Sequence, residues 1–308
     1  MEPIEFSNAY YVKLGRKGEW EEASIAGNII RIGWPEQALE DINQGNLEIV
    51  EKRLQQKIAD KGEVVKDLNA LKRIAESTPD DVWIIFHSSR LWWCRVGQQE
   101  VFEDGISKYR KVACRWRNHD INRNPLIISR IPGRLSKIQR FAGTICRVHE
   151  IDDLRRLLND QPSEAFQTIS DAKEALAAEV QKGLKLLHWK DFETLTDLIF
   201  RNAGWRRISL LGETMKYVDI ELEEPVTGDL YQVQVKSTAT VSDFEDYAKR
   251  FSQTDFRRLY FVVHSPQGDW SDYQGVASVD KVEPLLPGRL AEMVIEFGLL
   301  NWLMKKIK

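Results

Sequence analysis

The sequence predicts a two-domain protein of the mixed α+β and α/β classes, with helices and short strands in both halves. Three observations lead to this prediction. The chain has 308 residues, and about 150 residues per domain is a usual ratio. Apolar residues at strand spacing and at helix spacing alternate along the whole chain. Between them, Asn159-Asp160-Gln161-Pro162-Ser163 is rich in turn-forming residues, which divides the chain into domains over 1–160 and 161–308.

The elements of the first domain follow from the spacing of apolar residues. Residues 10–34 predict short extended pieces separated by glycines. Residues 47–75 predict a helix in two pieces broken near Gly62. Four β-branched or aromatic runs predict strands, over 82–86, 91–96, 112–116 and 144–148. An extended segment over 125–131 and a helix over 152–158 complete the domain.

The second domain begins with two predicted helices. The first covers 170–187, and the second presents Phe192, Leu195 and Ile199 on one face and ends at Ala203-Gly204. Three strands are then expected, over 208–211, 217–222 and 230–237, with a polar loop before the second and a turn over 225–229 before the third. The order of elements predicts a central sheet with helices packed on it.

Composition excludes several classes of protein. Hydrophobic residues make up 43% of the chain and charged residues 30%, so packed cores are expected and disorder is not. No apolar run approaches the length of a membrane span, and the first residues lack the pattern of a secretory signal. The three cysteines, Cys94, Cys114 and Cys146, include no close pair, which excludes a disulfide framework and a CxxC metal site. We expect a cytoplasmic protein with no membrane partner.

The third strand of the second domain carries the sharpest chemical signal. Strand alternation puts Gln232, Gln234 and Lys236 on one face. If this strand forms a hairpin with the strand before it, Asp219 lies close to Gln234 and Lys236. A carboxylate and neighbouring oxygens can hold Mg²⁺, and a lysine beside them can position the attacking water and stabilise charge on a phosphate. This set of groups suits hydrolysis of a phosphodiester.

The same residues resemble a known family. Phe192-Glu193, Gly204-Trp205, Val218-Asp219-Ile220 and Gln232-Val233-Gln234-Val235-Lys236 are similar to the Mrr-type restriction endonuclease domain of the PD-(D/E)XK superfamily, in the variant with Gln in place of the second acid. The resemblance covers about residues 185–305 and implies a restriction-endonuclease-like α/β domain with a central mixed sheet. One departure is the loop Gly212-Glu213-Thr214-Met215-Lys216-Tyr217, which lacks the acid that the family often has before its strand Asp.

The resemblance also implies roles for individual residues. Asp219 would bind Mg²⁺ directly, with the Gln234 side-chain oxygen and the Val235 carbonyl, and Mn²⁺ would substitute. Lys236 would activate or position water. Glu193 would be an additional catalytic carboxylate. An ordinary surface Glu193 paired with Lys190 or Arg201 is the alternative.

Charge is unevenly distributed in a chain whose formal net charge is only −3. Residues 106–149 contain eleven basic residues and one acid, Asp120. Such a segment attracts a phosphate backbone, and guanidinium groups pair with phosphate in a bidentate way. The candidate backbone contacts are all arginines: Arg115, Arg117, Arg130, Arg134 and Arg140. The alternative is a solvated face whose charges have partners elsewhere in the fold.

Tryptophan is concentrated in the same half of the chain, where six of ten lie within the first 116 residues. The segments 81–87, 91–96 and 112–116 resemble a PUA-like barrel of the EVE type, and Ile30-Arg31-Ile32-Gly33-Trp34 is similar to the early segment of modified-base readers. Such domains take a base out of the stack. The candidate pocket residues are Trp34, Trp83, Trp92, Trp93 and Ser89. Alternation sends Trp92 and Trp93 to opposite faces, and core packing or a turn is the alternative role for each of the five.

Together these features predict a modification-dependent (type IV) restriction endonuclease. It would recognise a modified cytosine in double-stranded DNA and hydrolyse the backbone with Mg²⁺. A homodimer is expected, since one site per chain cuts one strand. No GxxxxGK[ST] motif occurs, so no nucleotide is expected. Two alternatives stay open: a binding protein for modified nucleic acid with an inactive nuclease domain, and a structure-specific repair nuclease. DNA and RNA are not distinguished.

Overall fold

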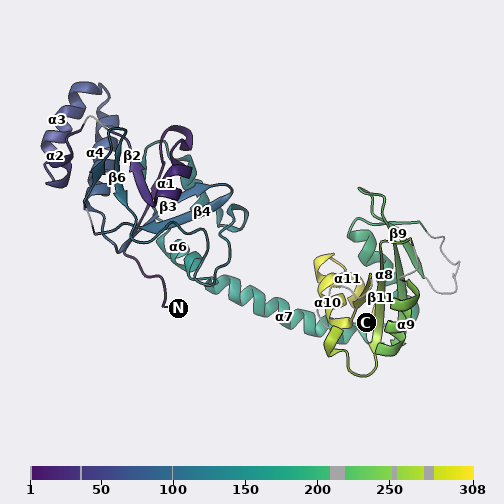
Figure 1. Cartoon of the computed structure of the whole chain (residues 1–308). Coiled ribbons are helices and arrows are strands. Elements are labelled where there is room, and N and C mark those ends of the chain that lie inside the picture. The colour runs from purple at the N-terminus through teal and green to yellow at the C-terminus, as the bar shows by residue number, and fades with distance from the viewer. Residues whose placement is uncertain (1, 35–36, 99, 209–218, 252–254, 274–280) are drawn as a thin grey trace. The chain divides into compact units, whose positions relative to one another are not determined.

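The computed structural model describes residues 2–34, 37–98, 100–208, 219–251, 255–273 and 281–308. The chain forms two compact units, residues 1–164 and 165–308, which Figure 1 shows in colour by residue number. Both units mix helices with strands.

The first unit contains two small sheets. Its strands are β1 (Asn8–Val12), β2 (Ile29–Ile32), β3 (Asp81–His87), β4 (Arg90–Arg95), β5 (Phe102–Glu103), β6 (Lys108–Lys111) and β7 (Ile145–Arg147). One sheet has the order β4-β3-β1-β7, with β1 parallel to β3, and the other has the order β2-β6-β5. The described strands thus form two sheets and no closed barrel.

The two sheets stay separate because of the path that the chain takes after β6. The amide of Val112 donates to Asn28 beside β2, whereas the next amide, of Ala113, donates to Arg95 at the end of β4. The segment therefore passes from one sheet to the other instead of extending either. The strand predicted over 112–116 is wrong for this reason: the segment makes only isolated bridges, Val112 with Val96 and Arg117 with Trp93.

Helices cover the two sheets of the first unit. They are α1 (Glu21–Gly27), α2 (Leu39–Asn43), α3 (Leu47–Lys57), α4 (Lys61–Glu76), α5 (Gly133–Ser136) and α6 (Ile151–Leu158). The predicted break in the helical segment is confirmed, and it lies just before Gly62, where Asp60 caps α4 by accepting from the amides of Gly62 and Glu63. The segment predicted as extended over 125–131 instead contains a 3₁₀ turn over Ile128–Arg130.

The second unit contains one mixed sheet of five strands. These are β8 (Arg206–Arg207), β9 (Ile220–Glu223), β10 (Leu230–Ala239), β11 (Arg258–Pro266) and β12 (Val282–Leu285), in the order β12-β11-β10-β9-β8. Strands β10, β11 and β12 are parallel, and β9 is antiparallel to β10 and β8. The predicted central mixed sheet is confirmed. The predicted strands over 208–211 and 217–222 lie partly outside the described residues.

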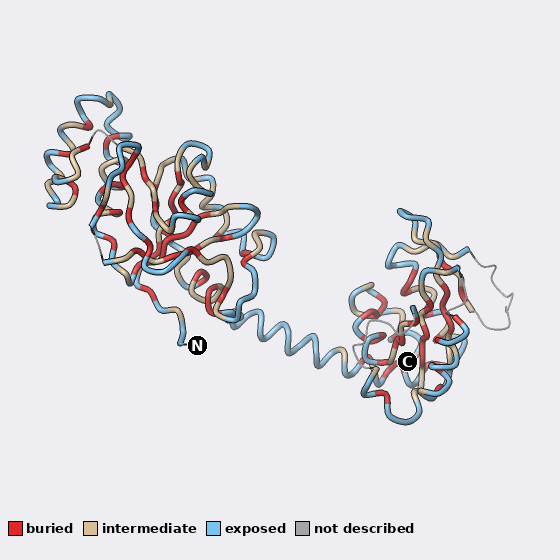
Figure 2. The backbone as a smooth tube through the Cα atoms, in the orientation of Figure 1, coloured by how far each residue is buried: buried red, intermediate tan, exposed pale blue. Residues whose placement is uncertain are grey.

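Two hydrophobic cores pack on this sheet, and Figure 2 colours the buried stretches of this unit red. The helices are α7 (Glu164–Leu184), α8 (Trp189–Asn202), α9 (Val241–Phe251), α10 (Pro287–Glu296) and α11 (Leu300–Lys306). Helices α8, α10 and α11 share a core with Val233 of β10, whereas α9 shares a core with Phe261 of β11. Because Gln234 is the register partner of Phe261, Gln234 and Lys236 lie on the sheet face that α9 covers.

Candidate functional site

Asp219, Gln234 and Val235 are joined at the hairpin of β9 and β10. The Asp219 amide donates to the carbonyl of Val233 (3.1 Å), which continues the β9–β10 ladder by one residue. The Oδ2 atom of Asp219 accepts from the Gln234 side-chain Nε2 and from the backbone amide of Val235 (2.6 Å). The predicted approach of Asp219 to Gln234 is therefore present in the structure.

The other atom of the Gln234 amide has no partner. Gln234 is only 5% exposed, and its Oε1 makes no hydrogen bond in the described part of the chain. The Nε2 group faces a carboxylate that can only accept, so Oε1 is left as the free acceptor. A buried acceptor without a donor is costly and uncommon. An oxygen-seeking cation is a natural partner for such an atom.

Burial raises the pKa of Asp219 above its usual range, and the Val235 amide and the Lys236 ammonium only partly offset this effect. Burial likewise raises the pKa of Glu193, on α8, with the negative charge of Asp219 as the next cause. Glu193 is thus electrostatically coupled to the hairpin. Of its two alternative partners, Arg201 forms an ion pair with Asp197 (3.0 Å), whereas the charge of Lys190 lowers the pKa of Glu193 and so partly offsets the effect of burial.

Lys236 lies two residues beyond Gln234 on the same face of β10. Its Nζ is 5.0 Å from the centre of the Tyr247 ring on α9. Its charge lowers the pKa of Asp243 after the effect of the Thr240 hydrogen bonds, and it also acts on Asp219. The lysine therefore lies between the hairpin carboxylate and the start of α9.

The donor set fits a hard divalent cation that keeps most of its waters. Among residues that the structure describes, no group of three or more His, Cys, Asp or Glu side chains is close enough to hold a metal. Asp219, the Gln234 Oε1 and the Val235 carbonyl nevertheless offer three oxygens on the β9–β10 hairpin. Mg²⁺ commonly uses one or two carboxylates and several waters. Loop 212–217 lies outside the described residues.

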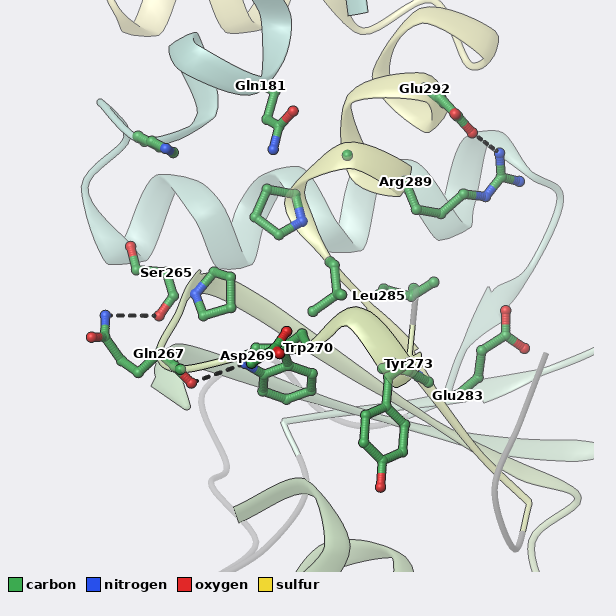
Figure 3. A pocket seen from close by; sticks show the side chains of 17 residues that line it. Gln181, Ser265, Gln267, Asp269, Trp270, Tyr273, Glu283, Leu285, Arg289 and Glu292 are labelled. Atoms are coloured by element: carbon green, nitrogen blue, oxygen red, sulfur yellow. Dashed lines mark hydrogen bonds and ion pairs between the residues drawn. The ribbon is translucent and has the colours of Figure 1, made fainter. Parts of the chain in front are cut away.

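A separate groove opens elsewhere in the second unit, with a volume of about 940 Å³. Figure 3 shows that its labelled residues come from the end of β11 and the segment after it, from β12 and from the first turns of α10, with Gln181 of α7 opposite. Trp270 and Tyr273 line one side, and Arg289 is paired with Glu292 (2.8 Å). Asp219, Gln234, Lys236 and Glu193 do not line this groove, so it is distinct from the hairpin site.

The predicted pocket tryptophans occupy different environments. Trp83 is fully buried, and its indole N–H donates to Ser77 (2.8 Å). Trp93 is 4% exposed and donates to the His119 carbonyl (3.0 Å). These two side chains serve the core. Trp92 and Trp93 pack in different cores on opposite sheet faces, as alternation predicts.

Trp34, Trp92 and Ser89 are more accessible. Trp34 and Trp92 are half-buried, and the Trp34 indole donates to the Asp67 carboxylate (2.9 Å). Ser88 and Ser89 both have positive φ (49° and 59°) and join β3 to β4. Two such residues form the tight turn that suits a hairpin, so Ser89 has the turn role.

The basic segment divides into structural and exposed side chains. Lys108 is fully buried, with Nζ donating to the Trp34 carbonyl (2.8 Å). Arg110 donates to the carbonyls of Ile74 (2.7 Å) and Ala75 (3.2 Å) at the end of α4, where helix carbonyls need partners. These two cations stabilise the fold and are not presented to a ligand.

The five candidate arginines also differ from one another. Arg134 is paired with Asp153 (2.6 Å), and the Arg117 guanidinium lies 5.1 Å from the Trp93 ring centre. Arg115, Arg130 and Arg140 are exposed and form no ion pair with any described residue. These three are the cations most available to a phosphate.

Two residues with unusual surroundings, Gln37 and Tyr247, are not identified from the sequence alone. Gln37 is 2% exposed, and neither atom of its side-chain amide has a partner in the described part of the chain. Tyr247 lies beside Lys236. A helix that follows the Gln-x-Lys strand and crosses back over the same sheet face was the signal that could have identified Tyr247.

Neither a protein-family model nor a curated protein matches this chain. Solved structures similar to it include the DNA modification-dependent restriction endonuclease AspBHI, at 10% identity over 73% of this chain and 68% of that chain, with a TM-score of 0.31. They also include MspJI restriction endonuclease in complex with a 27-mer oligonucleotide, at 12% identity over 89% and 71%, with a TM-score of 0.30.

Restriction endonuclease FokI bound to DNA is a third similar structure, at 11% identity over 69% of this chain and 38% of that chain, with a TM-score of 0.25. Because all three TM-scores and identities are low, the functional case rests on the residues of the site. Across the described ranges, no helix combines the length and apolar character that crossing a bilayer requires.

Proposed function

We propose that this protein is a modification-dependent (type IV) restriction endonuclease, which recognises a modified cytosine in DNA and hydrolyses the phosphodiester backbone with Mg²⁺. One observation carries the proposal: Asp219, Gln234 and Lys236 lie together on one face of the β9–β10 hairpin, and the buried Gln234 Oε1 there has no hydrogen-bond partner among the described residues. A carboxylate, a free oxygen and an ammonium are the groups that metal-assisted phosphodiester hydrolysis requires.

In this proposal Asp219, the Gln234 Oε1 and the Val235 carbonyl hold Mg²⁺, and Mn²⁺ substitutes for it. The cation supplies positive charge that stabilises the phosphate in the transition state. The Val235 amide fixes the orientation of the Asp219 carboxylate (2.6 Å). The Lys236 ammonium positions the attacking water and stabilises charge on the phosphate oxygens. Glu193, whose pKa is raised by burial and by the charge of Asp219, assists as an additional carboxylate.

The first unit supplies DNA binding. Arg115, Arg130 and Arg140 are exposed cations for the phosphate backbone. Of the four candidate tryptophans, the half-buried Trp34 and Trp92 remain to stack on a base taken out of the helix. The reader assignment, a PUA-like domain of the EVE type, follows from the sequence resemblance. Cutting both strands requires two sites and hence a homodimer.

A cleavage assay tests the proposal. Matched duplexes would contain cytosine, 5-methylcytosine, 5-hydroxymethylcytosine or glucosylated hydroxymethylcytosine, with Mg²⁺ present. We expect one modified duplex to be cut, and cutting to be lost in Lys236→Ala and Asp219→Ala but retained in Lys305→Ala, an exposed lysine of the same unit. Equal cutting of all four duplexes would indicate a nuclease that ignores base modification and would overturn the reader assignment.

One observation favours a second candidate, a binding protein for modified nucleic acid with an inactive nuclease domain. Among residues with described positions, no group of three or more His, Cys, Asp or Glu side chains is placed to hold a metal ion. Calorimetry with Mg²⁺ and Mn²⁺ separates the two candidates. Tight binding of one modified duplex, with no cation binding and no cleavage, would establish the second.

A further inference from the structure

We propose that Tyr247 is a positioning residue for the Lys236 ammonium, with its ring serving as the seat of the cation. This inference rests on the proposed function, because it concerns the lysine of the same site. The Lys236 Nζ lies 5.0 Å from the centre of the Tyr247 ring. A cation within about 6 Å of an aromatic ring centre is attracted by the ring quadrupole.

The ring itself is held in place by its neighbours. It packs against the Phe261 ring, with 5.1 Å between ring centres. Phe261 is fully buried in β11, beside Gln234 in the register. Tyr247 also continues the buried stripe of α9 that contains Phe244, Ala248 and Phe251. The seat is therefore built from the core and not from a mobile loop.

The start of α9 is fixed as well. Asp243 Oδ2 accepts from the amide (2.8 Å) and the hydroxyl (2.7 Å) of Thr240, the residue that joins β10 to α9. This connection sets where the helix leaves the strand, so it sets the distance from Tyr247 to Lys236. The Asp243 carboxylate is occupied by the Thr240 groups, and Lys236 forms no ion pair with any described carboxylate.

The seat matters because a lysine side chain is long and loses much rotamer freedom when it is ordered. If the ring already holds the ammonium near Asp219, part of the entropy cost of ordering the lysine is met before the reaction begins. Groups that are held in place before reaction contribute to the rate and not to ground-state binding. The predicted signature of losing the ring is a lower kcat with little change in KM.

Three variants test the role of the ring. Tyr247→Phe keeps the ring, whereas Tyr247→Leu and Tyr247→Met remove it and fill the space with flexible apolar groups. We expect kcat to fall by about 3-fold to 30-fold in the Leu and Met variants, from the usual strength of a cation–π contact. KM should stay within about 2-fold, and Tyr247→Phe should stay within about 2-fold of the wild type on both parameters. Tyr273→Leu is the matched control, because Tyr273 packs on the same core as Tyr247, against Phe244 (5.1 Å), whereas the Lys236 ammonium lies over the Tyr247 ring.

A second measurement does not depend on cleavage. The ring current of Tyr247 should shift the Lys236 side-chain NMR signals upfield in the wild type and in Tyr247→Phe, and the shift should vanish in Tyr247→Leu and Tyr247→Met. A wild type that shows the shift but cuts no duplex would overturn the proposed function and leave the cation seat intact. Absence of the shift in the wild type would overturn the seat. Loss of the shift with an unchanged kcat would overturn the positioning role, as would an equal loss of kcat in Tyr273→Leu.

Discussion

The Gln234 side chain donates through Nε2 to Oδ2 of Asp219, fifteen residues earlier in the chain and on the neighbouring strand. This hydrogen bond joins a neutral amide to a buried carboxylate. A neutral amide keeps a second oxygen at the site without adding a second buried negative charge. The cost is that Oε1 is left without a donor in the described part of the chain.

Replacing Gln234 with glutamate tests this interpretation. Gln234→Glu puts two carboxylates in contact at a buried position, which should destabilise the cation-free protein by about 1–3 kcal/mol. Divalent cations should reverse the loss, because the new site binds the folded state with an additional carboxylate. Thermal melts with and without Mg²⁺ measure both effects.

The neighbouring Gln232 provides the control for this experiment. Its Nε2 donates to Glu221 (3.4 Å) on the same strand pair, so Gln232→Glu introduces a similar contact between like charges two residues away from the candidate cation site. We expect destabilisation without rescue by Mg²⁺. Equal rescue of both variants would show that the cation acts on general charge and not at Asp219.

The sequence predicts the residues of this site that lie on one strand or one hairpin better than the residue that a following helix contributes. Strand alternation alone places Gln234 and Lys236 on one face, and the hairpin brings Asp219 to them. Tyr247 could not be predicted in the same way. Its position depends on the direction in which α9 returns over the sheet, which the Thr240–Asp243 contact sets, and on packing against Phe261.

In the first unit, the composition does not show which basic and aromatic side chains are exposed, because packing determines their exposure. The basic segment is visible in the sequence, but only burial separates Lys108 and Arg110 from exposed arginines such as Arg115. Both buried cations bind backbone carbonyls that no local pattern identifies. Trp83 and Trp34 look equivalent in the sequence, yet the first lies in the core and the second at its edge.

Replacing Asp219 with asparagine should separate stability from activity. The pKa of Asp219 is raised in the folded state, chiefly by burial, so folded protein holds this proton more tightly than unfolded protein. The unfolding free energy therefore falls as pH rises from the ordinary carboxyl pKa through the raised value, and the loss is complete above that window. The Asp219→Asn variant has no carboxyl at this position, so its unfolding free energy lacks this decrease with pH.

We expect Asp219→Asn to melt at least as high as the wild type at pH 8, while cleavage falls by about 10²-fold or more because the carboxylate that we propose to bind Mg²⁺ is gone. At acidic pH, where the wild-type carboxyl is protonated, the two melting temperatures should converge. Melting curves at several pH values measure this. A variant that melts well below the wild type at pH 8 would show that the carboxylate stabilises the fold.

The turn between β3 and β4 offers a test of the Ser89 assignment. Ser88 and Ser89 both adopt positive φ, which asparagine and glycine tolerate better than serine does. Replacing the pair with Asn-Gly should stabilise the protein by up to about 1 kcal/mol and leave binding of modified DNA unchanged. Denaturant unfolding and a binding titration check the two parts. Weaker DNA binding in a more stable variant would return Ser89 to the list of ligand contacts.

The exposed arginines of the first unit should determine how DNA binding depends on salt. Arg115, Arg130 and Arg140 form no ion pair with described residues, and each phosphate contact contributes about 0.9 to the slope of log Kd against log salt concentration. Changing all three to alanine should lower that slope by up to about 3 and weaken modified and unmodified duplexes equally. Lys57, Lys61 and Lys66, exposed on α3 and α4, form the matched control, because their replacement changes the net charge by the same amount. If the control variant lowers the slope as much, DNA responds to the total charge of the unit, and the basic segment is not the contact surface.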